Sequence, residues 1–231
     1  MLRAVTPAPV CRRLYLVRHG ETLYGEQALT DRGYGQIEAL GALMADVPLE
    51  AIYTSPLGRA RATAETIARH VPAPIITVET LREIEPGAIT TPDLGEVLAA
   101  IRAFFASGGT TWDTPFLGGE TYRQVRERVW PLIEDHARRL DWRRVAVVAH
   151  GGVNNALIGR ILGTSGPGLA NIDQDFGCLN IVDFFGERPV LRLLNFTAYD
   201  ALKTALETSS VDVVADLLAG SAASLGDRLR S

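Results

Sequence analysis

Two patterns of apolar residues alternate along the chain. Short runs of consecutive apolar residues are typical of buried strands, because both faces of such a strand must be covered. These runs lie at 13–17, 51–55, 75–78 and 144–149. Between them, apolar residues recur every three or four positions, as in amphipathic helices. These stretches lie at 30–47, 57–71, 94–105, 121–140 and 153–162. The alternation predicts an α/β domain with a largely parallel sheet.

The last apolar segments have a different arrangement. Residues 179–184 and 190–194 flank Gly186 and predict a β-hairpin, which would add an antiparallel edge. The expected fold class is therefore α/β, with three α/β/α layers around a mostly parallel sheet. We expect residues 1–231 to form a single domain, with 1–11 as a flexible tail and 203–231 as a C-terminal extension. Apolar residues of this extension would dock on the body or on a second copy, so a homodimer stays open: Val211, Val214, Leu217 and Leu218.

Several local signals refine these elements. Thr30 is a candidate helix N-cap, and Thr121 with Gln124 has the spacing of a capping box. The Pro86-Gly87 pair predicts a turn. His136 lies on the apolar stripe of its helix, which predicts a packed histidine and not a ligand.

Composition excludes several classes of partner. The 231 residues include 23 Lys and Arg against 27 Asp and Glu, a formal charge of −4, which predicts no nucleic-acid or anionic-membrane partner. No stretch approaches the roughly twenty apolar residues of a membrane helix. The two cysteines, Cys11 and Cys178, lack metal-site spacing and predict reduced thiols in a cytoplasmic protein.

Two of the four histidines follow buried strands in the same way. Arg18 and His19 close the first strand before Gly20, and His150 closes the strand at 144–149 before two glycines. Arg59 lies in the first turn of a helix, where a cation opposes the helix dipole and favours an anionic ligand nearby. The carboxyl ends of parallel strands share one edge, so we expect these side chains to converge there.

The converging groups suit a small dianion. Arginine binds phosphate through its planar fork, and Arg18, Arg59, the two histidines and glycine amides would surround such a group. A metal site is disfavoured because the arginines would repel a cation. No G-x-S-x-G, Walker or G-x-G-x-x-G motif occurs. These observations favour phosphoryl transfer through a histidine nucleophile, with a carboxylic acid protonating the leaving group.

The same segments resemble a known family. Leu16-Val17-Arg18-His19-Gly20-Glu21-Thr22 closely resembles the R-H-G motif of the histidine phosphatase superfamily, in its phosphoglycerate mutase-like branch. The segments at 54–60, 81–84 and 148–152 resemble those carrying the second arginine, the proton donor and the second histidine of that family. The resemblance runs from about residue 13 to residue 195.

This resemblance implies roles for individual residues. His19 would be the phosphorylated nucleophile, with the Gly20 carbonyl fixing its tautomer. Glu83 would be the general acid and then the base. The phosphate would be held by a set of side chains and amides: Arg18, His19, Thr22, Arg59, His150 and Gly151. The resemblance implies no metal and no cofactor.

The chain departs from the family pattern in two places. The Trp-Asn pair that commonly follows the first motif is replaced by Tyr24-Gly25, and the loop after it is short. After Glu83, the usual aromatic and W-E-G run is replaced by Glu85-Pro86-Gly87, so Glu85 or Glu120 stays open as the working acid.

We therefore expect a metal-independent phosphomonoesterase that acts on a small phosphorylated metabolite through a phosphohistidine. The absence of the long insertions of the mutases favours water as the acceptor. A phosphoglycerate mutase-type transfer is the alternative, and a weakly catalytic phosphate-binding or protein-interaction module of the same fold is a second one.

Overall fold

The computed structural model describes residues 11–23, 27–88, 94–106, 111–138, 141–166, 172–205, 208, 209 and 212. Residues 1–10 of the expected tail lie outside these ranges, as do Tyr24, Gly25 and the apolar residues of the C-terminal extension.

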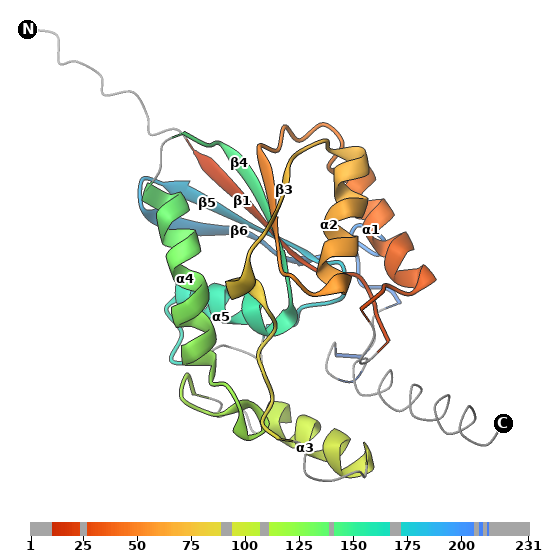
Figure 1. Ribbon diagram of the computed structural model, residues 1–231, viewed down its shortest axis with the longest axis vertical. Coiled ribbons are helices and arrows are strands. Elements are labelled where there is room, and N and C mark those ends of the chain that lie inside the picture. Colours follow the sequence, from red (N-terminus) through yellow and green to blue (C-terminus); the bar gives the residue numbers. More distant parts are fainter. Residues whose placement is uncertain are drawn as a thin grey trace, which may run out of the picture.

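A mixed sheet forms the centre of the described chain (Figure 1). Its strands are β1 (Arg12–Arg18), β2 (Ala51–Thr54), β3 (Ile75–Thr77), β4 (Arg144–Ala149), β5 (Leu179–Phe185) and β6 (Arg188–Phe196). Their order is β3-β2-β4-β1-β5-β6. The first four strands pair in parallel, and β5 and β6 pair antiparallel. The predicted mostly parallel sheet with an antiparallel edge is confirmed.

Helices cover both faces of this sheet. They are α1 (Asp31–Leu43), α2 (Gly58–His70), α3 (Leu94–Ala106), α4 (Tyr122–Arg138) and α5 (Gly151–Leu162), with short 3-10 turns η1 (Glu79–Leu81) and η2 (Phe116–Gly118). In Figure 1, α1 and α2 lie on one side of the sheet, α4 and α5 lie on the other, and α3 lies beyond its end. The expected three layers are present.

Strand β1 contributes to both cores. Leu14 and Leu16 pack with the residues of α4 and α5, whereas Tyr15 and Val17 pack with those of α1 and α2. Successive side chains of a strand point to opposite faces, and here helices cover both of them. This double coverage explains why the sequence of β1 is a continuous apolar run.

Several local predictions are confirmed. Thr30 accepts the Gly33 N–H with its hydroxyl at 3.0 Å and caps α1. Thr121 donates its N–H to Gln124 Oε1 at 2.7 Å, and the Gln124 N–H returns a bond to Thr121 Oγ1 at 3.2 Å, which forms the capping box of α4. His136 is buried, and its ring packs edge-on against Tyr53.

One local prediction is wrong, and one helix begins earlier than expected. Residues 82–88 form no turn at Pro86-Gly87 but run as an irregular segment beside residues 116–120. A Cβ on Gly87 would lie 2.5 Å from the Leu117 carbonyl oxygen, so this glycine permits close contact between two backbones. The helix predicted at about 153–162 is present as α5 and begins two residues earlier, because His150 is its N-cap and both glycines form the first turn.

None of the helices in the described ranges is long and apolar enough to cross a membrane.

Candidate functional site

The carboxyl ends of β1, β2 and β4 meet at one edge of the sheet, as expected for neighbouring parallel strands. Arg18 ends β1, His19 follows it, His150 follows β4, and Arg59 lies in the first turn of α2, just after β2. The ring centroids of His19 and His150 lie 5.1 Å apart. Arg59 Nε lies 3.2 Å from His19 Nε2. The structure therefore brings together these residues from distant parts of the chain.

His19 has a defined tautomer. Its Nδ1 lies 2.8 Å from the Gly20 carbonyl oxygen, which can only accept, so Nδ1 carries the proton. Arg59 Nε can only donate, so Nε2 of His19 presents its lone pair. The side chain is buried. Burial, followed by the charges of Arg59 and Arg18, lowers the pKa of His19 well below 6.5. His19 is thus a neutral imidazole with Nε2 unprotonated.

His150 is held by Ser55, a residue that sequence analysis missed. His150 Nε2 lies 2.8 Å from Ser55 Oγ, which also accepts the Leu57 N–H at 3.3 Å. His150 Nδ1 is buried and has no partner among the described residues. Burial, followed by nearby charges, lowers the pKa of His150 well below 6.5. Ser55 lies four residues before Arg59, in the connection between β2 and α2, and this proximity is the signal that could have found it.

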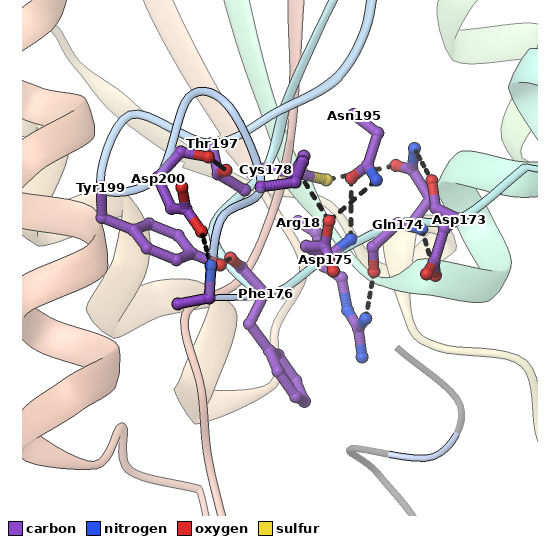
Figure 2. A network of polar contacts seen from close by, with 12 residues as sticks. Arg18, Asp173, Gln174, Asp175, Phe176, Cys178, Asn195, Thr197, Tyr199 and Asp200 are labelled. Carbon is purple, nitrogen blue, oxygen red and sulfur yellow. Dashed lines mark hydrogen bonds and ion pairs between the residues drawn. The ribbon is translucent and has the colours of Figure 1, made fainter. Parts of the chain in front are cut away.

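Arg18 is buried at the end of β1. Its Nη1 donates to the Gln174 carbonyl, and its guanidinium carbon lies 3.9 Å from the centre of the Phe176 ring (Figure 2). Burial lowers the pKa of Arg18. Arg18 Nε is buried without a partner among the described residues. One donor of this guanidinium is therefore left for a ligand.

A buried network of side-chain amides fixes Gln174, whose carbonyl accepts the hydrogen bond from Arg18. Gln174 and Asn180 bond to each other twice, at 3.0 and 2.8 Å, and Asn154 donates to Gln174 Oε1 at 3.1 Å. The Tyr199 hydroxyl donates to the Phe176 carbonyl at 3.0 Å (Figure 2). Sequence analysis missed Gln174 and Phe176, because their segment has no interpretable periodicity.

Glu83 reaches the same edge from the segment after η1. Its Oε1 accepts the Gly152 N–H at 3.1 Å and the Ile84 N–H at 2.9 Å. A Cβ on Gly152 would lie 2.6 Å from Glu83 Oε1, and one on Gly151 would lie 3.6 Å from the Arg18 guanidinium. Gly152 thus lets the carboxylate of Glu83 approach the start of α5, whereas a Cβ on Gly151 would meet Arg18 at an ordinary van der Waals distance.

The two alternative carboxylates lie elsewhere. The Glu85 side chain is exposed, and Glu120 forms a two-pronged ion pair with Arg128. Of these three carboxylates, Glu83 is the one that contacts the start of α5.

Thr22 has a local bond. Its hydroxyl donates to the Ala28 carbonyl at 2.7 Å and closes the loop after His19. Its contact with phosphate stays a prediction.

Comparison with known proteins identifies the family. Residues 14–197 match the model of the histidine phosphatase superfamily, branch 1. The chain belongs to this superfamily.

Named members of the superfamily resemble the chain over most of its length. The adenosylcobalamin/alpha-ribazole phosphatase of Salmonella typhimurium is 29% identical over 196 residues, which cover 80% of this chain and 97% of that protein. The metal-independent phosphoserine phosphatase of Arabidopsis thaliana is 32% identical over 171 residues, covering 67% of this chain and 71% of that one. The structure of YhfR from Bacillus stearothermophilus is 27% identical, with a TM-score of 0.68, over 80% of this chain and 96% of that chain.

The site of this superfamily member is suited to an anion with several oxygens. Two guanidinium groups and two neutral imidazoles surround the edge, and the amides at the start of α5 lie beside them. Among the described residues, no cluster of three or more His, Cys, Asp or Glu is arranged to hold a metal ion.

Proposed function

We propose that the protein is a metal-independent phosphomonoesterase that forms a phosphohistidine on His19. One observation carries the proposal. His19 is held by Gly20 and Arg59 as a neutral imidazole whose unprotonated Nε2 lies beside a guanidinium group. A neutral imidazole nitrogen is a good nucleophile, and its covalent intermediate divides the hydrolysis into two easier steps.

In the first step, His19 Nε2 attacks the phosphorus atom and the bond from phosphorus to the ester oxygen breaks. Arg18, Arg59 and the Nδ1–H of His150 stabilise the negative charge on the other phosphate oxygens. Thr22 and the Gly151 amide would add donors to them. Glu83, in its protonated form, gives a proton to the leaving alkoxide, which departs as an alcohol.

In the second step, water attacks the phosphohistidine. Glu83, now a carboxylate, takes a proton from the water as its oxygen bonds to phosphorus and the bond to Nε2 breaks. Inorganic phosphate leaves and His19 returns to its starting form. No metal and no cofactor take part in this scheme.

The proposed substrate is a small phosphate ester of an aliphatic alcohol. The alpha-ribazole phosphatase matches 80% of this chain, whereas the probable phosphoglycerate mutase GpmB of Erwinia tasmaniensis, 28% identical, matches 65% of it. The longer match supports hydrolysis, and mutase-type transfer stays the alternative. The buried state of Arg18, His19 and His150 supports a ligand group as small as phosphate. We also propose a cytoplasmic location, supported by the unpaired thiols of Cys11 and Cys178.

The test is hydrolysis of a panel of phosphomonoesters by purified protein with a chelator, beside His19→Ala. We expect phosphate release by the wild type alone, and an acid-labile, alkali-stable phosphoprotein after rapid quenching. Equal turnover by a folded His19→Ala variant would disprove the mechanism. Isomerisation of phosphoglycerate without phosphate release would favour a mutase, and phosphate binding without either reaction would favour a binding module.

A further inference from the structure

An ion pair outside the phosphate site contacts the segment that carries Glu83. Arg128, on α4, binds Glu120 in two-pronged fashion, with Nε to Oε1 at 2.7 Å and Nη2 to Oε2 at 3.0 Å. The same Nη2 lies 3.3 Å from the Glu83 carbonyl oxygen, and Nη1 donates to the Thr80 carbonyl. Arg128 therefore bonds to the backbone within η1 and again at Glu83 itself.

Glu120 holds the segment from its other end. Its N–H donates to the Glu85 carbonyl at 2.8 Å, and its Oε2 accepts the Glu85 N–H at 3.2 Å. The backbones are in close contact here, because a Cβ on Gly119 would lie 2.4 Å from the Glu85 carbonyl oxygen. The backbone is thus held at two points around Glu83. The Glu83 carbonyl accepts a bond from Arg128, and two residues later Glu85 forms two hydrogen bonds with Glu120.

We propose that the Arg128–Glu120 pair positions Glu83 as the proton donor to the leaving group; this inference rests on the proposed function. Residues 82–88 belong to no helix or strand, so regular hydrogen bonding does not orient them. The Arg128–Glu120 pair orients these residues instead, through its hydrogen bonds to the main chain at Thr80, Glu83 and Glu85. The Gly152 amide then fixes the carboxylate. Both groups of the pair act through Glu83, so they are positioning residues.

The bonding also assigns a role to Glu120, one of the carboxylates that the sequence left open as the acid. Its two oxygens are shared between a guanidinium and a backbone amide. The side chains of Arg128 and Glu120 are only 24% and 16% exposed, so water screens this pair less than a surface pair. Such a pair suits a fixed geometry better than proton exchange with a substrate.

The test compares two classes of ester. An alkyl phosphate needs a protonated leaving group, whereas a nitrophenyl phosphate releases a stable phenolate without one. We expect Arg128→Lys and Glu120→Gln to lower the rate of alcohol release in the first turnover of the alkyl phosphate on the order of 10²-fold, the scale of a misplaced catalytic group. In the same first turnover, which precedes the attack of water on the phosphohistidine, release of nitrophenol should change by less than a few fold. Lysine keeps the charge of Arg128 but cannot form its two-pronged bonds.

The same helix offers a matched control. Arg123 and Asp113 also form a two-pronged ion pair, on the exposed side of α4. Arg123→Lys and Asp113→Asn should leave both rates at the wild-type level. Thermal unfolding of every variant separates misfolding from misplacement, and two variants of the Arg128–Glu120 pair keep the test decisive if one does not fold.

A double-mutant cycle decides the inference. In a Glu83→Gln protein, the added Arg128→Lys change should have no further effect on alkyl phosphate hydrolysis, because there is no proton donor left to position. Multiplicative losses would overturn the inference, and so would equal losses on both ester classes in the first turnover. If the wild type is active and His19→Ala is inactive, these outcomes leave the proposed function standing. A wild type inactive on every ester overturns both.

Discussion

Ser55 Oγ lies 2.8 Å from His150 Nε2, and this bond decides which nitrogen of His150 carries the proton. Ser55 Oγ accepts the Leu57 N–H, and its hydroxyl hydrogen needs an acceptor. Among the described residues, His150 Nε2 is the acceptor for this hydroxyl hydrogen, so Nε2 is unprotonated. The proton of His150 therefore lies on Nδ1, the buried nitrogen without a protein partner in the described chain. This atom is the donor that we assign to the phosphate.

Removal of this hydroxyl should weaken catalysis. Ser55→Ala frees His150 to exchange tautomers, so we expect kcat/KM to fall on the order of 10-fold, the equivalent of about 1.4 kcal/mol. Nitrogen NMR of the ring should detect the mixed tautomers. Thr54→Val is the control, since it removes a neighbouring buried hydroxyl that donates to the Ser55 carbonyl and not to His150. Unchanged kcat/KM in Ser55→Ala would contradict the tautomer assignment.

Loss of Arg59 should weaken phosphate binding. A hydrogen bond to a charged group contributes roughly 1.5–3 kcal/mol, so Arg59→Ala should raise the inhibition constant of inorganic phosphate by about 10- to 150-fold. Arg61→Ala is the matched control, because Arg61 is an exposed arginine of the same helix. Equal inhibition of Arg59→Ala and wild type would place Arg59 outside the phosphate site.

Phe176 should orient Arg18. Its ring lies 3.9 Å from the guanidinium carbon, and a buried contact of this kind contributes about 2 kcal/mol. We expect Phe176→Leu to lower kcat/KM by about 10-fold while phosphohistidine still forms. Phe185→Leu removes a ring that also faces an arginine, Arg188, at 5.9 Å, and should keep full activity. A full-activity Phe176→Leu protein would show that Gln174 alone suffices to hold Arg18.

The buried histidines should make stability depend on pH. Burial lowers the pKa of His19 and His150 in the folded state, whereas unfolded histidine has a pKa of about 6.5. Below pH 6.5 the unfolded chain then binds more protons than the folded chain. The stabilisation from the neutral histidines is therefore fully present above this pH, and the free energy of unfolding falls as the pH decreases. The slope reaches about 1.4 kcal/mol per pH unit for each histidine. Urea unfolding should give a shallower slope for His19→Gln, and an identical slope would refute the assignment.

Gly152 should be required for the position of Glu83. The added Cβ in Gly152→Ala would lie 2.6 Å from Glu83 Oε1, so the carboxylate must move and hydrolysis of alkyl phosphates should fall at least 10-fold. Gly35→Ala is the contrasting change, since a Cβ there meets nothing within 4 Å. It should stabilise α1 by roughly 0.5–1 kcal/mol without loss of activity. Wild-type hydrolysis by Gly152→Ala would separate Glu83 from the chemistry.

Much of the site follows from local sequence. A run of apolar residues predicts a buried strand, and the polar residue that ends the run must lie at the sheet edge. This logic places Arg18, His19 and His150, because the strand and the functional side chain are adjacent in the chain. The same local logic predicts the capping box at Thr121 and the N-cap at Thr30, and both are present.

Only the tertiary structure decided how these groups are held. Gly152 and Glu83 are 69 residues apart, Ser55 and His150 are 95 apart, and Arg18 and Gln174 are 156 apart. Such pairs leave no periodic signal, since each depends on how separate elements pack. The Pro86-Gly87 pair demonstrates the limit: local propensity predicts a turn, whereas contact with residues 116–120 keeps the segment beside its neighbour. Short-range patterns thus determined the strands and their terminal residues, and long-range packing determined which carboxylate reaches the site.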